Sequence, residues 1–221
     1  MKIFVMFLSL TLILMGCGKG EEDIVDNNAN IVESTANIVD NKALEARDGL
    51  VYMKDKTSPF SGTAESRHKN GELNSSITYV NGKKDGLAGY WYENGQVRME
   101  YNYKDGKKDG LTRSWSESGQ LMKEATYKED MEDGMFKIWY EGGQLKSETT
   151  YKDGKKIGLI RSWYESGEPQ MEATYKDGRK DGLVRMWYEN GQPKMEAPYK
   201  DGKEDGPVRT WDENGEMLQL E

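Results

Sequence analysis

The sequence predicts an all-β protein, an elongated single sheet built as an antiparallel meander of 24-residue β-hairpin repeats. The first observation is the spacing of tryptophan, because all six tryptophans stand 24 residues apart, at Trp91, Trp115, Trp139, Trp163, Trp187 and Trp211. The second is that tyrosine keeps the same interval from Tyr79 to Tyr199. The third is a pair of hairpin signals in each unit, such as Asn-Gly at 94–95 and Asp-Gly at 105–106. A period without drift means that each repeat is one structural unit stacked on its neighbours.

The runs between these signals are rich in aromatic and β-branched residues and are predicted as strands. Two-residue turns are expected at both signals, because Asn-Gly and Asp-Gly supply the positive φ that both central positions need. A turn of this kind at 118–119 sets Arg113 opposite Glu124. The same register predicts further pairs of opposite charge, Lys137–Glu148, Arg161–Glu172 and Arg185–Glu196.

The same register predicts the aromatic contacts. Three tryptophans should face a cation and form a cation–π contact, in the pairs Trp91–Arg98, Trp139–Lys146 and Trp187–Lys194. Tyrosines should face apolar residues in Tyr92–Val97, Tyr140–Leu145, Tyr164–Pro169 and Tyr188–Pro193. Glycines opposite tyrosines, which allow a sheet to bend, are expected in Gly86–Tyr103, Gly110–Tyr127 and Gly182–Tyr199.

The strands alternate with a period of two, so the sheet has two different faces. One face should carry the leucines, the Arg/Glu pairs and the tryptophan column. The other should carry tyrosine, methionine, isoleucine, valine and alanine, and we expect it to be the drier face.

Composition excludes several functions. The chain of 221 residues has a net charge of −8, and a protein this acidic binds nucleic acid poorly. Its one cysteine, Cys17, and one histidine, His68, cannot form a Cys/His metal cluster. We therefore expect no metal, no cofactor and no catalytic residues, and a protein that is not an enzyme.

The N-terminus has the pattern of an export signal. Lys2 precedes a nearly unbroken apolar run from Ile3 to Met15, which is too short to span a bilayer but fits a signal-peptide core. The run ends in Leu14-Met15-Gly16-Cys17, which resembles the bacterial lipobox. The resemblance implies that residues 1–16 are a signal peptide and that Cys17 carries lipid, which anchors the chain in the cell envelope. The same resemblance implies, because Gly18 follows the cysteine, that the chain lies in the outer membrane if the cell is Gram-negative.

Residues 17–49 are expected to be the lipidated cysteine followed by a tether. Three heptads begin at Ile24, Ile31 and Ile38, which leaves a short coiled coil and a flexible spacer as alternatives. We favour the flexible spacer, because asparagine and β-branched residues make a poor isolated helix. The repeat array is expected over 50–221, with an N-terminal cap at 50–59 and a degenerate first unit that has Arg67 in the tryptophan position.

The segment Tyr175–Gln192 has the pattern Y-x-x-G-R-x-x-G-x-x-x-x-W-Y-E-N-G-Q, and its equivalents return in every unit. This pattern resembles the bacterial MORN-repeat variant, the repeat of the YwqK-type antitoxin family. The resemblance implies a MORN-like fold and neutralisation of a partner toxin by direct binding, without catalysis. Because Cys17 predicts export, an antitoxin role would be immunity at the envelope.

The tryptophan column is the candidate binding surface. It could stack glycans, including peptidoglycan, although each tryptophan could equally cover its own hairpin. The recurring Glu93, Glu141, Glu165 and Glu189 open hairpin turns on an exposed rim, and His68 is expected to be solvated. The sequence thus predicts an envelope lipoprotein that binds a protein partner, with a toxin as one candidate. The alternative is a glycan-binding or structural envelope lipoprotein.

Overall fold

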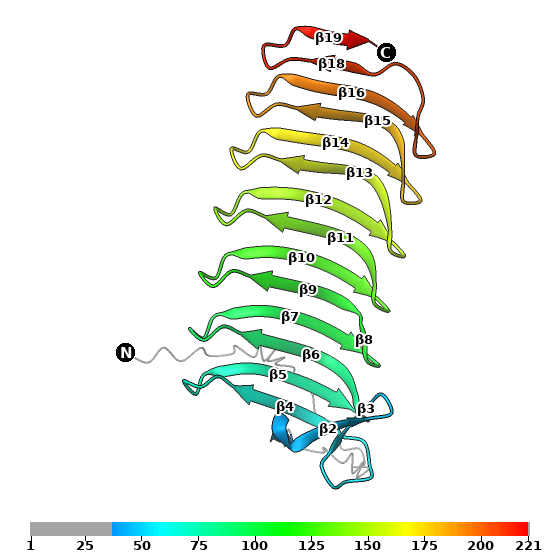
Figure 1. Ribbon diagram of the computed structural model, residues 1–221. Helices are drawn as coiled ribbons and strands as arrows, with labels where there is room; N and C mark the ends of the chain where they lie inside the picture. Colours follow the sequence, from blue (N-terminus) through cyan, green and yellow to red (C-terminus); the bar gives the residue numbers. More distant parts are fainter. Residues whose placement is uncertain (1–36, 221) are drawn as a thin grey trace, which may run out of the picture. The chain divides into compact units, whose positions relative to one another are not determined.

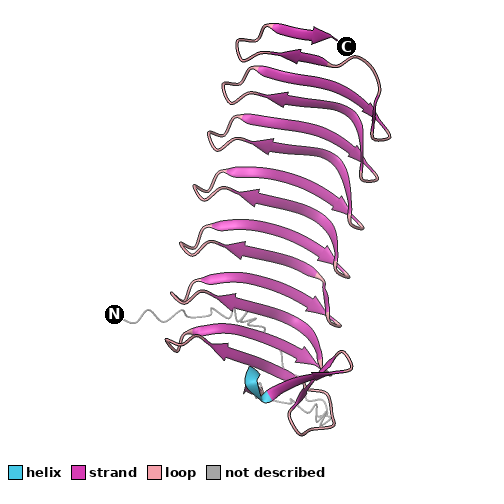
Figure 2. Ribbon diagram, in the orientation of Figure 1, coloured by secondary structure: helices cyan, strands magenta, loops and turns pink. Residues whose placement is uncertain are grey.

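The computed structural model describes residues 37–220, which belong to the second of two compact units, Thr35–Glu221 (Figures 1 and 2). The predicted signal peptide, Cys17 and the first two predicted heptads, apart from Asn37, lie outside the described residues. The main element is a 17-stranded sheet in which hairpin follows hairpin, as the repeat period predicts. Among the described residues, no helix has the length and apolar character needed to cross a membrane.

Each repeat contributes an outgoing and a returning strand (Figure 1). The first five hairpins comprise β4 (Gly62–Arg67) and β5 (Leu73–Val80); β6 (Lys83–Trp91) and β7 (Val97–Lys104); β8 (Lys107–Lys108), β9 (Gly110–Trp115) and β10 (Leu121–Lys128); β11 (Met131–Trp139) and β12 (Leu145–Lys152); β13 (Lys155–Trp163) and β14 (Pro169–Lys176). The last two comprise β15 (Arg179–Trp187) and β16 (Pro193–Lys200); β17 (Lys203–Glu204), β18 (Arg209–Trp211) and β19 (Met217–Leu220). We call the loops that follow the tryptophans the tips and the Asp-Gly connections the turns; Figure 1 shows the tips on the left and the turns on the right.

The turns have the conformation that the sequence predicts. Asp105 and Gly106 both have positive φ, 51° and 87°, and Lys104 pairs with Lys107 across them. The third repeat keeps this turn without glycine, since Glu129 and Asp130 have φ of 50° and 69°. Each turn also bonds to the repeat before it, as when the Gly106 amide donates to the Lys84 carbonyl at 2.8 Å.

The tips differ from the expected two-residue turn. The Gly95 amide donates to the Tyr92 carbonyl at 3.0 Å, and the Tyr92 amide donates to the Gln96 carbonyl at 2.8 Å. These bonds enclose a three-residue loop in which Gly95 has a φ of 83° and Asn94 has no positive φ. This is the hairpin in which a type I turn is followed by a glycine bulge. The prediction failed because Asn-Gly satisfies either loop, and in this one only the glycine needs positive φ.

The register of the strand centres is confirmed, and the register beside the tips is wrong. Arg113 pairs with Glu124, and Lys137–Glu148, Arg161–Glu172 and Arg185–Glu196 also pair as predicted. Between these pairs and the tip the register shifts by a β-bulge, so tryptophan aligns with the residue predicted to face tyrosine: Trp91–Val97, Trp139–Leu145, Trp163–Pro169 and Trp187–Pro193. The predicted contacts of tryptophan with cations are therefore not formed; Lys146 and Lys194 lie over Tyr140 and Tyr188 instead.

The strands bend near the turns, and Figure 1 shows them arching across the sheet. The predicted pairs Gly86–Tyr103, Gly110–Tyr127 and Gly182–Tyr199 are confirmed. The φ of Gly110 is 108°, a conformation that side chains disfavour, and an added Cβ would lie 3.2 Å from the Asn102 Cβ. Glycine is therefore required at this bend.

The N-terminal cap begins earlier than residue 50. It consists of β1 (Ile38–Asp40), the 3₁₀ turn η1 (Asn41–Ala43), β2 (Leu44–Arg47) and β3 (Leu50–Met53). The third heptad thus forms strand and turn rather than coiled coil or flexible spacer. β1 pairs in parallel with β4, so the sheet is not wholly antiparallel, while β2 and β3 form a separate two-stranded sheet.

The cap completes the one thick core of the described unit. Phe60, Ala64, Ile77, Tyr79 and Ala88 are buried there, and the cap packs partly buried apolar side chains against them, namely Val39, Leu44, Val51 and Met53. Backbone bonds fix its position, because the Val51 amide donates to the Gly82 carbonyl and the Phe60 amide to the Val51 carbonyl. The expected capping role of 50–59 is confirmed.

Candidate functional site

The buried residues of the sheet lie on one face, which we call the tyrosine face because it carries Tyr103 and Tyr127. Small or β-branched side chains form a continuous buried column along it: Ala64, Ala88, Thr112, Ala125, Thr149, Ile160, Ala173, Val184 and Ala197. A single layer can bury such residues only if longer neighbours cover them. The expectation that this face is the drier one is confirmed.

Tyrosines and cations alternate near the turns of the tyrosine face. The Nζ of Lys84 lies 4.9 Å from the ring centre of Tyr103, and that of Lys180 lies 4.5 Å from the ring centre of Tyr199. Lys108 and Lys156 make the same contact with Tyr127 and Tyr175. Burial raises the pKa of Tyr103 to about 12, with neighbouring Tyr90 and Tyr101 adding to the effect, and burial lowers the pKa of Lys84. These contacts cover the aromatic rings, so the row of tyrosines and lysines stabilises the fold.

The opposite face, the tryptophan face, has all six tryptophans in a column next to the tips, and each is half-buried. The ring of Trp91 lies back over Gly89, where a Cβ would clash with it. Trp91 therefore covers its own strand, as the second interpretation of the column predicts.

A second apolar column lies nearer the turns of the tryptophan face. It consists of Leu87, Leu111, Met135, Leu159 and Leu183, of which three are among the most exposed large apolar side chains of the described residues. Leu87 is 50% exposed, Met135 47% and Leu159 40%. Exposed apolar groups in a continuous row are typical of interaction surfaces.

An ion-pair ladder runs between the two apolar columns. Arg161 donates to Glu148 and Glu172 at 3.3 and 3.1 Å, and Glu196 accepts from Arg185 at 3.1 Å. Arg113 donates to Glu124 at 2.8 Å, as predicted from the sequence. Because each charge has its counter-charge within the sheet, this ladder offers a partner little net charge.

The tips bind consecutive repeats to one another. The Tyr164 hydroxyl donates to the Trp187 carbonyl at 2.8 Å, and Tyr92, Tyr140 and Tyr188 donate to the next tryptophan carbonyl in the same way. His68 takes this position in the first unit, with Nε2 2.9 Å from the Trp91 carbonyl oxygen. The expectation that His68 is solvated was wrong, because its side chain is only 17% exposed. Its position 24 residues before Tyr92 was a signal that could have revealed its role.

Charge is divided unevenly between the two edges. The seven tip loops, residues 68–72, 92–96 and their equivalents to 212–216, hold ten acidic side chains and one lysine. The six turns with their flanking residues, 80–83 to 200–203, hold ten basic and six acidic side chains. The tip edge is thus strongly acidic and adjoins the tryptophan column, whereas the turn edge is weakly basic.

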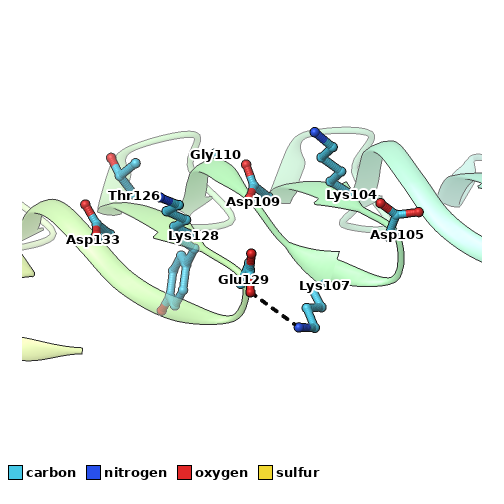
Figure 3. Close-up of a pocket in the computed structure, with 10 residues that line it drawn as sticks. Lys104, Asp105, Lys107, Asp109, Gly110, Thr126, Lys128, Glu129 and Asp133 are labelled. Atoms are coloured by element: carbon cyan, nitrogen blue, oxygen red, sulfur yellow. Dashed lines mark ion pairs between the residues drawn. The ribbon is translucent and has the colours of Figure 1, made fainter. Parts of the chain in front are cut away.

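A hollow of about 780 Å³ lies at the turn edge around Lys104, Asp109, Thr126 and Asp133 (Figure 3). Figure 3 shows Lys107 paired with Glu129 at its border, at 3.6 Å. It is lined by both acidic and basic side chains, most of which are exposed to solvent. No group of three or more His, Cys, Asp or Glu side chains in the described part of the chain could hold a metal ion.

Comparison with protein families identifies the class that this geometry defines, a repeat scaffold of stacked hairpins. Five consecutive segments match the family described as MORN repeat variant, at residues 84–105, 108–129, 132–153, 156–177 and 180–201. The matched segments cover the sheet from β6 to β16. A comparison with curated proteins found no match.

Proposed function

We propose that this protein is a non-enzymatic scaffold, exported and anchored by lipid at Cys17, that binds a protein partner on its tryptophan face. The observation that supports binding is the row of exposed apolar side chains on that face, represented by Leu87, Met135 and Leu159. Exposed apolar rows are costly in water and gain free energy when a partner covers them. The MORN-variant repeats are consistent with a binding scaffold.

A protein fits this face better than a small molecule. The two apolar columns continue from repeat to repeat, and two strands per repeat advance the array by about 10 Å. A ligand that contacts several repeats must therefore be an extended polymer or a folded surface. Between the columns, the ladder that includes Arg161 and Glu172 neutralises its own charges.

Binding to the tryptophan face can be tested with the mature chain carrying Cys17→Ser, to keep it soluble, as bait for envelope proteins. The matched bait adds Trp139→Ala and Trp163→Ala, and circular dichroism must show that its fold is intact. Proteins retained by the first bait and lost from the second support the proposal. Equal retention by both contradicts it, and retention of purified peptidoglycan instead favours the glycan-binding alternative.

The lipid anchor has a separate test. In cells fed a labelled fatty acid, the parent chain should become labelled and sediment with membranes, because two or three acyl chains anchor stably. Cys17→Ser should abolish both the label and the sedimentation. A Cys17→Ser chain that sediments like the parent would contradict anchoring at this residue.

The antitoxin role is the finer form of the proposal. It combines the YwqK-type resemblance with export, and it places the protein where it would neutralise a toxin at the envelope. Expression of the protein should then protect cells from a toxin encoded beside it, and the Trp139→Ala and Trp163→Ala variant should protect less. A toxic neighbouring gene that the protein fails to counter would contradict this role.

A further inference from the structure

We infer that the partner segment of the tryptophan face is basic: an extended, amphipathic stretch of protein laid along the array, with apolar side chains on the sheet and lysine or arginine side chains toward the tips. The inference rests on the proposed function and adds the chemistry of the partner. It comes from the position of the acidic edge beside the tryptophan column.

The apolar part of the surface runs along the array rather than along single strands. Leu87 and Met135 belong to alternate repeats, so an occupant that covers both must cross the hairpin between them. The tryptophans form a parallel column on the same face. An extended segment along the array would contact each repeat once per about 10 Å.

The charged border of this surface is the tip edge. Glu117, Glu141, Glu165 and Glu189 are exposed, and each stands two residues after a tryptophan. Two of these hairpins also carry a lysine near the tip, Lys146 and Lys194, whose ammonium groups each lie 5.1 Å from the centre of a tyrosine ring, that of Tyr140 and Tyr188 respectively. The tip carboxylates therefore face solvent at the edge of the apolar surface.

Charge complementarity selects the occupant. An acidic segment on the tryptophan face would lie beside a row of carboxylates, and like charges so placed weaken binding and slow association. A basic segment gains attraction at every tip it passes, and this gain falls as salt shortens the Debye length to about 3 Å at 1 M. The ladder between the columns has its charges paired and does not offset this preference.

The probe is a synthetic peptide of alternating leucine and lysine, about 14 residues long, which spans about four repeats when extended. Its counterpart alternates leucine and glutamate. The protein is the mature chain with Cys17→Ser. All six tryptophans lie on the face in question, so their fluorescence reports binding directly.

Two variants with the same change of net charge separate the tips from the rest of the chain. The tip variant carries Glu117→Gln, Glu141→Gln, Glu165→Gln and Glu189→Gln. The turn variant carries Asp105→Asn, Asp153→Asn, Asp177→Asn and Asp201→Asn, which the turns tolerate because Asn-Gly also suits them. We expect the tip variant to bind the lysine peptide roughly tenfold more weakly than the parent, and the turn variant to stay within about twofold.

The outcomes distinguish this inference from the proposed function. Tighter binding of the lysine peptide than of the glutamate peptide, with loss in the tip variant and in the Trp139→Ala and Trp163→Ala variant, supports both. Binding that needs the tryptophans but ignores the tip substitutions overturns the basic partner alone. If the lysine peptide does not bind, the inference of a basic partner is overturned. If it binds equally well without Trp139 and Trp163, the inference is also overturned, and this result counts against the tryptophan face as a binding surface.

Discussion

Tyr103 shows how a single-layer sheet builds a local interior. Burial raises its pKa from an ordinary 10.0 to about 12, and the Lys84 ammonium covers its ring. Because the folded state holds this proton more tightly than the unfolded state, its contribution to stability is complete below pH 10 and is lost as the pH rises toward 12. Denaturant midpoints measured across this interval should fall with pH.

Tyr103→Phe gives the control for this prediction. The variant has no hydroxyl to ionise, so its midpoint should fall less steeply between pH 10 and 12 than that of the parent. The midpoint of the variant should still fall somewhat with pH, because burial also raises the pKa of Tyr79 and Tyr127. Identical slopes for parent and variant would show that Tyr103 does not carry the effect.

The tip tyrosines allow a second prediction at the scale of one hydroxyl. Tyr164→Phe removes the 2.8 Å bond to the Trp187 carbonyl and should lower the free energy of unfolding by about 0.5–1.5 kcal/mol. Ser116 is the natural gap in this row, and Ser116→Tyr should restore the bond to the next repeat and raise stability. Urea denaturation measures both changes, and a Tyr164→Phe chain as stable as the parent would refute the role of the bond.

At the scale of the element, the turn at Glu129-Asp130 holds two non-glycine residues at positive φ, 50° and 69°. Glu129→Asn should stabilise the chain by about 0.5–1 kcal/mol, because asparagine tolerates this conformation better than glutamate. The exposed Lys107–Glu129 pair that is lost contributes little. The reverse change at a neighbouring turn, Asp153→Glu, should destabilise by a similar amount in the same denaturation assay, and a gain there would contradict the argument.

The elements also show where sequence reasoning succeeds and fails. The pairing of Arg113 with Glu124 was predictable because opposite charges across a strand pair are favourable. A register shifted by one residue would instead place Arg113 opposite Lys123. The bulge beside Trp91 was not predictable, since the sequence Asn-Gly is compatible with a two-residue or a three-residue loop. The error moved tryptophan by one pairing position and replaced predicted tryptophan contacts with tyrosine contacts.

At the scale of the molecule, the array was predictable because its period is exact over six tryptophans, whereas the part of the cap before residue 50 was not. Ile38–Asp40 has the same heptad pattern as the segments before it, and only the exposed edge of β4 explains why it forms a strand. The tryptophan column of the candidate site followed from the period. The acidic edge became evident only when the fold placed every tip on one side and every turn on the other.

That edge predicts how the whole array responds to salt. Neighbouring tip carboxylates, about 10 Å apart, repel by roughly 0.4 kcal/mol per pair in unscreened water. The variant with Glu117→Gln, Glu141→Gln, Glu165→Gln and Glu189→Gln should therefore exceed the parent in stability by about 1 kcal/mol at 0.01 M salt, where the Debye length is about 30 Å.

At 1 M salt the stability advantage of the variant should disappear, because the Debye length is then about 3 Å and the tip carboxylates of the parent no longer repel one another. Paired urea titrations at the two salt concentrations measure the difference directly. The turn variant with Asp105→Asn, Asp153→Asn, Asp177→Asn and Asp201→Asn has the same net charge and should gain less, because cations surround its turns. An equal gain in both variants would mean that total charge, rather than the row at the tips, sets the salt response.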